Sequence, residues 1–257
     1  MITFNINDLT SIFYNFLFIS IRIISFIVVA PLLGDKSISK KIKLLFSFVI
    51  SWFFMFFLPI IQINLFSIDG FLILIEQILI GICLGFSMQL VFSVIKLTGE
   101  IISFQMGLSF SSLLDWNTRS NTSVLSRFFY IFLLLFFLES NGHIWEISVI
   151  LDTFYKIPIK KIELDSNVFL NIVTYSKFIF VSSFMIMFPI IIVQLFLNIS
   201  MGILNRISSQ ISIFSIGFTI TLIVGMYTLF LFIPMIPYVY NNIFNHLIYL
   251  LSILVKI

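Results

Sequence analysis

The stretch of sequence that decides the fold is Phe71–Ile95, which reads FLILIEQILIGICLGFSMQLVFSVI. Glu76 is the one Asp, Glu, Lys or Arg residue within it. A helix of about 20 apolar residues crosses the hydrocarbon core of a bilayer, and this run is longer than that. It therefore predicts a membrane-spanning helix.

Similar apolar runs lie on both sides of this stretch. The chain is 60% hydrophobic and 10% charged, whereas soluble domains hold about 25% charged residues. We expect an all-α, polytopic membrane protein with about six to eight long, partly broken apolar helices and a single integral-membrane domain over residues 1–257. The predicted spans are Ser11–Leu33, Ile42–Ile63, Phe71–Ile95, Val124–Leu138, Phe169–Leu204 and Ile211–Pro234, followed by an apolar tail, Tyr238–Ile257.

Two segments depart from the pattern of simple spans and short loops. The segment Glu139–Asp165 holds five of the eleven acidic residues and is interpreted as a loop. The fifth span is too long for one simple crossing, and Pro189 lies near its middle. Because proline removes a backbone donor and kinks a helix, we expect two helices or a bent hairpin there.

The residue types present exclude several classes of function. The net charge is +3, but the basic residues stand at the ends of apolar runs, as membrane orientation requires, so no nucleic-acid surface is predicted. Cys83 is a single cysteine, and His143 and His246 lie far apart, so neither a thiolate nor a zinc site is expected. No nucleophile elbow, zinc-protease, phosphate-binding or dinucleotide motif occurs. The chain is therefore predicted to be no enzyme and to hold no cofactor.

Three ionisable residues, Arg22, Glu76 and Lys177, lie inside apolar runs. A charge facing lipid costs at least about 2.5–3.5 kcal/mol on insertion scales. We therefore expect all three residues to lie inside the helix bundle, where they face protein or water and not lipid. They could form an ion or proton path. The structural alternative, which we favour, is a buried pair such as Arg22 with Glu76 that orients helices.

Gly81 and Gly85 are four residues apart in an apolar helix. Such a pair leaves a flat face on which another helix can approach closely. We expect this face to pack against a helix of the same chain or of another subunit.

The most unusual stretch is Gly99–Asn121, which is too polar for a clean span and too apolar for an exposed loop. Bulky side chains alternate there with Ser and Gly, and hydrophobic constrictions can close a pore by excluding water. The alternative is a re-entrant or interfacial helix with no gating role.

Short motifs follow one another in a specific order along nearly the whole chain. They are Arg22 with Ala30-Pro31-Leu32; Glu76-Gln77 with Gly81 and Gly85; Gly99-Glu100-Ile101-Ile102 with Gln105-Met106-Gly107-Leu108-Ser109-Phe110; Asn141-Gly142-His143; Asp152-Thr153-Phe154 with Pro158; Asn198 with Gly202; and Leu204-Asn205-Arg206 with Gln210 and Ile216-Gly217-Phe218. Their joint order resembles the FliR family of type III secretion export-gate subunits. The motif residues that carry this resemblance best are Gln105, Gly107, Asn205, Arg206, Gln210 and Gly217.

The resemblance implies a role in protein export. It implies a multi-pass protein of the bacterial inner membrane and flagellar basal body, which forms with FliP and FliQ the channel that passes unfolded flagellar proteins. Proteins of the FlhB and FlhA type are further implied partners. The family's central loop plugs the closed channel, and on this sequence it corresponds to about Met106–Asn121. The implied plug residues are Met106, Phe110, Leu113, Leu114 and Asp115.

Other functions were weighed against this one. The motifs do not separate a flagellar gate from the equivalent subunit of an injectisome. A small-solute secondary transporter usually shows inverted repeats with paired broken helices, but only the span around Pro189 is broken here. An intramembrane enzyme would need a nucleophile and a base at membrane depth, and the sequence offers no such set.

Overall fold

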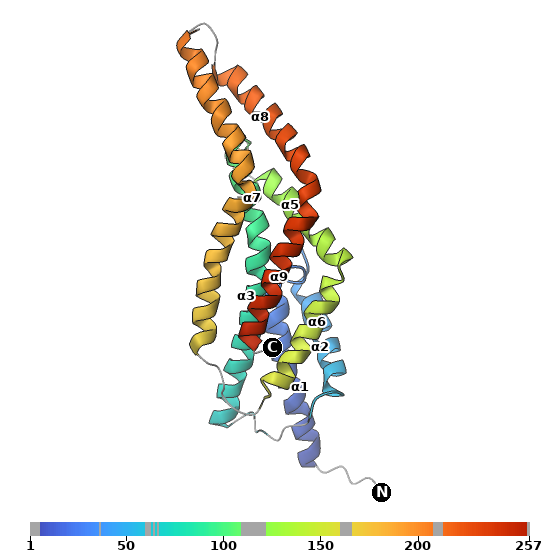
Figure 1. Cartoon of the computed structure of the whole chain (residues 1–257). Coiled ribbons are helices and arrows are strands. Elements are labelled where there is room, and N and C mark those ends of the chain that lie inside the picture. The colour runs from blue at the N-terminus through green and yellow to red at the C-terminus, as the bar shows by residue number, and fades with distance from the viewer. Residues whose placement is uncertain are drawn as a thin grey trace. The chain divides into compact units, whose positions relative to one another are not determined.

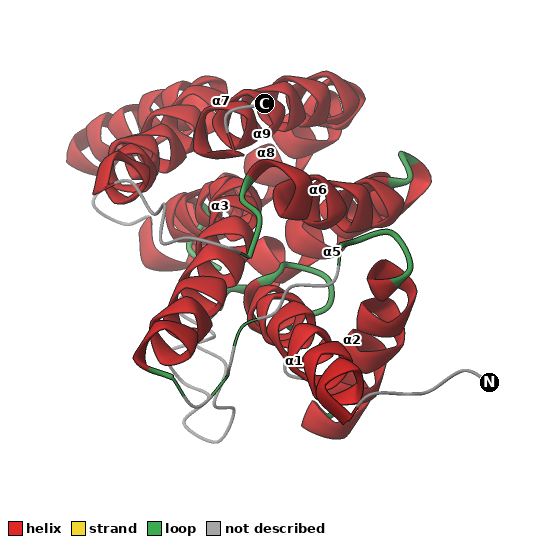
Figure 2. Ribbon diagram, turned by 90° about the horizontal axis from the view of Figure 1, so that it is seen from below, coloured by secondary structure: helices red, strands yellow, loops and turns green. Residues whose placement is uncertain are grey.

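The apolar runs of the sequence form long helices. The computed structural model describes residues 6–35, 37–59, 63, 65, 67–108, 122–159, 166–207 and 213–255, and all regular elements within these ranges are helical (Figure 2). The all-α class is therefore confirmed. The α-helices, labelled in Figure 1, are α1 (Ile6–Val29), α2 (Lys40–Met55), α3 (Ile68–Gln105), α5 (Val124–Glu139), α6 (Gly142–Lys156), α7 (Ser166–Ile207), α8 (Ile213–Phe232) and α9 (Ile236–Val255), and a short 3₁₀ helix, η1 (Ile233–Met235), joins α8 to α9.

Several of these helices are long and apolar enough to cross a membrane. Within the described residues there are four such segments, and the bent pair α5–α6 would make a fifth. The four are Leu9–Val29, Ile68–Gln105, Leu170–Leu204 and Gly217–Ser252. The 38 residues of α3 reach about 57 Å at about 1.5 Å per residue. Since the hydrocarbon core is about 30 Å thick, this helix is longer than a bilayer requires.

The predictions for three segments were wrong. The second span was expected to reach Ile63, but α2 ends at Met55, because Pro59 disfavours the helical conformation in the residue before it. The connection after Glu139 is not a loop throughout, since α6 occupies Gly142–Lys156. The fifth span is one continuous helix, α7, with Pro189 inside it. A proline removes one hydrogen bond of the ladder, and long apolar helices tolerate that loss.

The end of α2 depends on side chains from other helices. The Asn15 side chain on α1 donates to the carbonyl of Pro59 at 3.4 Å. The Tyr155 hydroxyl on α6 donates to the carbonyl of Phe57 at 3.3 Å. Carbonyls beyond a helix end need such partners where water is scarce. These two bonds tie the segment that follows α2 to α1 and α6.

The contacts within the chain divide it into two units. The first comprises Met1–Leu90, Phe137–Tyr175 and His246–Ile257, and the second comprises Val91–Phe136 and Ser176–Asn245. The boundaries fall inside α3, α5, α7 and α9, so these four helices run through both units. The prediction of a single domain remains a prediction.

Small residues bring the helices of the first unit close together. A methyl group on Gly81 would overlap Ser25 Oγ and lie 2.5 Å from the backbone oxygen of Arg22, and one on Gly85 would lie 2.9 Å from the backbone oxygen of Phe26. The two glycines therefore pack against α1 of the same chain. On the other side of α1, α2 lies alongside it (Figure 1); its buried face includes Ser47 and Ser51, whose hydroxyls bond to backbone carbonyls of α2 itself.

The second unit is held by hydroxyl bonds between helices and by an apolar cluster. Ser183 on α7 donates to the carbonyl of Val94 on α3 at 2.8 Å, and Ser126 on α5 donates to the carbonyl of Lys96 on α3 at 2.8 Å. Both acceptors lie on the backbone of α3, which makes that helix the common support. The core cluster consists of Ile102, Met106, Met187, Ile190 and Leu229.

Gly81→Ala should destabilise the protein by about 1–3 kcal/mol, because the added methyl overpacks the contact with α1. Thermal unfolding of the purified protein in detergent measures this change. Gly202→Ala is the matched control, since a methyl there meets nothing within 4 Å. Equal unfolding temperatures for the two variants would contradict the close packing of α3 on α1.

Candidate functional site

Arg22 forms the centre of a polar cluster in the first unit. Its side chain is fully buried. Nε donates to Gln77 Oε1 at 2.7 Å, Nη1 donates to Thr153 Oγ1 at 3.3 Å, and Nη2 donates to the carbonyl of Ile157 at 3.0 Å. The Thr153 hydroxyl donates its own proton to the carbonyl of Ile150, so its lone pairs face the guanidinium. One side chain of α1 thus binds α3 and α6 at once.

The positive charge of Arg22 is compensated from two further directions. Glu76 is also buried and attracts the guanidinium electrostatically. The guanidinium carbon lies 4.1 Å from the centre of the Phe154 ring, within the range of a cation–π contact. The expected attraction between Arg22 and Glu76 is therefore present, but the hydrogen bonds go to neutral groups. Gln77, Thr153 and the carbonyl of Ile157 were not expected as partners.

Glu146 is a second buried carboxyl group of the first unit. It lies on α6 with 1% of its surface exposed, and neither oxygen forms a hydrogen bond within the described part of the chain. The sequence had placed it in a loop. The buried positions Glu146, Val149, Ile150 and Thr153 follow one another at the spacing of one helix face, and this pattern could have revealed α6.

A second constellation lies in the second unit, where α3 ends. The amide of Leu108 donates to the carbonyl of Ser103, and the amide of Gly107 donates to that of Phe104. Gly107 has φ +78°. This pair of bonds with a left-handed residue is a Schellman motif, which stops a helix at a defined residue. A side chain at Gly107 would also meet the ring of Phe218 at 2.9 Å.

Met106, the residue before this turn, is fully buried in the core cluster. It lies against Gly225 of α8, where an added methyl would be 2.7 Å from Met106 Cγ. The same methyl would be 2.7 Å from Nε2 of Gln194, which donates to the carbonyl of Thr221 at 3.0 Å. The sealing of a channel by Met106 stays a prediction; in the single chain its side chain packs in the core and anchors the turn, because Gly225 leaves room for it.

The residues that follow residues 109–121 in the sequence are also held against α3. The Ser123 hydroxyl accepts from the amide of Ser126 at 3.2 Å and so caps the start of α5, as N-terminal Ser residues do. A methyl on Gly99 would lie 2.5 Å from the Cα of Ser126. The described residues on both sides of residues 109–121 are therefore held against helices of the second unit.

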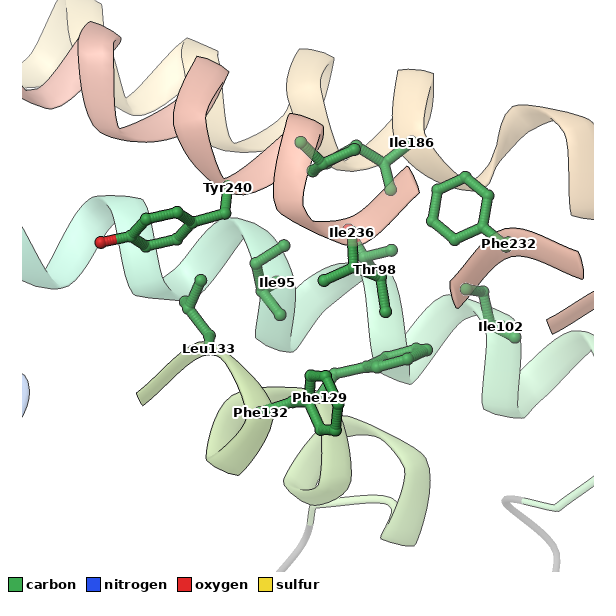
Figure 3. A pocket seen from close by; sticks show the side chains of 11 residues that line it. Ile95, Thr98, Ile102, Phe129, Phe132, Leu133, Ile186, Phe232, Ile236 and Tyr240 are labelled. Atoms are coloured by element: carbon green, nitrogen blue, oxygen red, sulfur yellow. The ribbon is translucent and has the colours of Figure 1, made fainter. Parts of the chain in front are cut away.

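A small apolar cavity lies beside these anchors. Its volume is about 30 Å³, and Figure 3 shows rings of Phe129 and Phe232 and the side chain of Ile102 around it. Two residues of the lining, Thr98 and Tyr240, carry hydroxyl groups. The Thr98 hydroxyl donates to the carbonyl of Val94. A cavity without free polar groups stays dry, so it offers no site for a polar ligand.

The remaining predicted residues divide into three groups. Lys177 is exposed, not buried as expected, because it shares the uncovered side of α7 with Phe180 and Phe184. Gln105 ends α3, Gly217 is buried in α8, and Asn205 and the exposed Arg206 lie in the last turns of α7. The positions outside the described residues are Phe110, Leu113, Leu114, Asp115 and Gln210.

The sequence matches the family described as bacterial export proteins, family 1, over residues 13–247. The chain belongs to this family. The flagellar biosynthetic protein FliR of Buchnera aphidicola subsp. Baizongia pistaciae (strain Bp) is 60% identical over 237 residues, which are 92% of each chain. FliR of Buchnera aphidicola subsp. Acyrthosiphon pisum (strain APS) is 44% identical over 98% of each chain. The surface presentation of antigens protein SpaR of Shigella flexneri is 27% identical over 161 residues, 63% of this chain and 62% of that protein.

Membership of this family of bacterial export proteins agrees with the long apolar helices. The chain is a multi-pass membrane protein and a component of an export apparatus, which works with other components of that apparatus. Both constellations lie inside the matched residues. Motifs that are distant in sequence meet in them: Arg22 with Gln77 and Thr153, and Gly107 with Phe218.

Arg22→Ala should destabilise this export protein by about 3–5 kcal/mol, the usual cost of removing one partner of a buried charged network. The side chain of Gln77 and the carbonyl of Ile157 would lose their donor, and Glu76 would lose its opposite charge. Arg127→Ala, at an exposed position of α5, should change stability by less than about 0.5 kcal/mol. Thermal unfolding in detergent compares the two, and similar losses would show that Arg22 does not hold α6.

Proposed function

We propose that this chain is a subunit of the flagellar type III protein export gate. In this proposal it forms, with subunits of the FliP and FliQ type, the channel that passes unfolded flagellar proteins across the bacterial inner membrane at the flagellar basal body. Proteins of the FlhB and FlhA type would be further partners. The observation that carries the proposal is the 60% identity to a flagellar biosynthetic protein over 92% of both chains.

The exposed surface supports a role inside a larger assembly. The outer side of α2 carries exposed Trp52 and Phe53, its C-cap Phe56 is exposed too, and α7 carries exposed Phe180 and Phe196. Helices such as α3 are longer than the bilayer is thick, so lipid cannot cover their whole length. Neighbouring subunits would cover the remainder.

The proposal assigns no catalytic role to the chain. The buried Arg22 holds helices together, and the family is one of export proteins. The equivalent gate subunit of an injectisome is the second candidate, since SpaR is also a relative. The lower identity and shorter coverage of that relative favour the flagellar assignment.

Within this proposal, residues 106–121 plug the closed channel. Both ends of this segment are anchored, at Gly107 and at Ser123. Phe110, Leu113 and Leu114 are the proposed sealing side chains, with Asp115 following them. Met106 is a further proposed sealing side chain, and in the single chain it packs in the core.

Extraction of the native membrane in mild detergent should recover this chain together with two other small membrane proteins. The apolar faces of α2 and α7 need protein neighbours, so the complex should remain stable after lipid is removed. Mass spectrometry of material purified through a tag on this chain measures the composition. Mixing tagged and untagged membranes after lysis controls for late association. Repeated recovery of a stable lone monomer would contradict the proposal.

Phe110→Ser combined with Leu113→Ser should make the resting gate leak ions, because a dewetted apolar seal opens to water when its side chains become polar. Ion flux across the membrane of resting cells measures the leak. Phe104→Ser is the control, since Phe104 is an exposed residue of α3 on the near side of the Gly107 anchor. Unchanged flux in the double variant would refute the plug and leave the subunit assignment intact.

A further inference from the structure

The net positive charge of the chain is concentrated in one short segment. Of the 14 basic and 11 acidic residues of the sequence, four lysines and one aspartate, Asp35, lie within residues 35–43. The rest of the chain therefore holds ten basic and ten acidic residues, whose charges balance. The whole net charge of +3 belongs to the segment that leads into α2 and begins it.

Three of these lysines lie in the first turn of α2, in the first unit. The Ser39 side chain caps this helix by accepting from the amide of Ile42 at 3.4 Å, a bond that fixes where a helix starts. Lys40 and Lys41 follow the cap directly and are exposed, and Lys43 is half-buried. We call Lys40, Lys41 and Lys43 the α2 lysine cluster.

The described part of the chain does not neutralise the α2 lysine cluster. The first turn of α2 contains no acidic residue, and none of the three ammonium groups forms an ion pair or a hydrogen bond with a residue that the structure describes. Asp35 accepts through Oδ1 from the amide of Ser37 at 2.8 Å. The positive end of the α2 dipole adds to the same field. The cluster therefore attracts an anion from outside the chain.

Exposed aliphatic side chains stand directly beside this charge. Ile42 is 57% exposed and Leu45 is 66% exposed. At 100° per residue they lie on the side of α2 opposite its buried residues Ser47, Ile50 and Ser51. Along α2 the surface thus changes from cationic to apolar within the first two turns.

The two ends of α2 lie in different surroundings. At about 1.5 Å per residue, its 16 residues reach about 24 Å, which is less than the hydrocarbon thickness of about 30 Å. The carbonyls of Phe57 and Pro59, beyond its end, accept from side chains of α6 and α1, as backbone groups away from water require. The lysine end is charged and must lie at a polar surface.

A phospholipid leaflet offers the same order of chemistry as this surface. Its phosphate groups lie outside the acyl chains, and lysine stems run along apolar surface while their ammonium groups reach outward. Anionic phospholipids attract basic segments that adjoin apolar helices. An acidic protein segment would also attract the lysines, but it would leave Ile42 and Leu45 uncovered. One lipid molecule covers both the charge and the aliphatic side chains.

We propose that the α2 lysine cluster binds the phosphate group of an anionic phospholipid whose acyl chains lie along Ile42 and Leu45. The inference goes beyond the proposed function and does not depend on it, because it requires a membrane but no export. It also places the first turn of α2 at the level of the lipid headgroups.

Native mass spectrometry tests the site on material purified in mild detergent through a tag on this chain. The probes are dioleoyl phosphatidylglycerol and dioleoyl phosphatidylcholine, which share their acyl chains and differ in net charge. The anionic lipid should bind at least about fivefold more tightly than the zwitterionic one, since one lysine near an anionic lipid contributes about that factor. Equal affinities for the two lipids would overturn the inference.

Lys40→Gln combined with Lys41→Gln should weaken binding of phosphatidylglycerol at least about tenfold, because two of the three charges are lost. Arg127→Gln combined with Lys156→Gln removes the same charge from exposed positions of α5 and α6 and is the matched control. It should change the affinity less than about twofold. Equal losses in the two double variants would show a general charge effect and refute the site.

Lys40→Arg combined with Lys41→Arg keeps both charges and should keep the preference for phosphatidylglycerol. Binding of phosphatidylcholine, which should be alike in all variants, reports that the fold is intact. If the arginine variant lost the preference as fully as the glutamine variant, while binding of phosphatidylcholine stayed alike, attraction of the phosphate by charge would be refuted.

Two further arms separate the lipid from other anions. Inorganic phosphate in large excess, at an ionic strength held constant with chloride, should not displace phosphatidylglycerol, and displacement would overturn the role of the acyl chains. In intact membranes a carbodiimide joins lysine amines to nearby carboxylates. It should not couple Lys40 or Lys41 to another protein. Such a coupling in most copies would make the cluster a protein interface and overturn the lipid site.

Discussion

The buried charge of Arg22 is the constraint on which the first unit depends. A guanidinium in an apolar interior must be surrounded by acceptors, and here they come from a side chain of α3 and from the end of α6. Because the partners lie on helices far apart in the sequence, the charge can be satisfied in one arrangement of these helices. The glycines of α3 serve the same contact, since Gly81 lies against the backbone of Arg22 itself.

The helices of the second unit are held together by other interactions than those of the first. Its helices are joined by hydroxyl groups that bond to backbone carbonyls and by a cluster in which Met106 fills the space above Gly225. The Schellman turn at Gly107 ends α3 in a fixed direction. The described residues on either side of the proposed plug, Gly107 and Ser123, are thus held by helices of the second unit.

The sequence predicted those features that depend on neighbouring residues along the chain. It was less informative about features that depend on contacts between helices. Apolar runs predicted the long helices, and the ionisable residues within them pointed to Arg22 and Glu76 as a buried pair. The helix α6 was missed because its acidic residues suggested solvent, although Glu146 is buried and Thr153 faces Arg22. Lys177 was expected to be buried because it interrupts an apolar run, yet its side of α7 is uncovered in the single chain. The anchoring role of Met106 depends on a glycine more than a hundred residues away, which no local pattern reveals.

The length of α3 has a consequence for the life of an unassembled copy. A helix of about 57 Å in a membrane with a core of about 30 Å leaves oily surface in water until neighbours arrive. Chaperones and proteases of the cell recognise such surface, so orphan copies would be cleared while incorporated ones persist. The abundance of the finished machine would then follow its scarcest component, with no dedicated regulator of synthesis required.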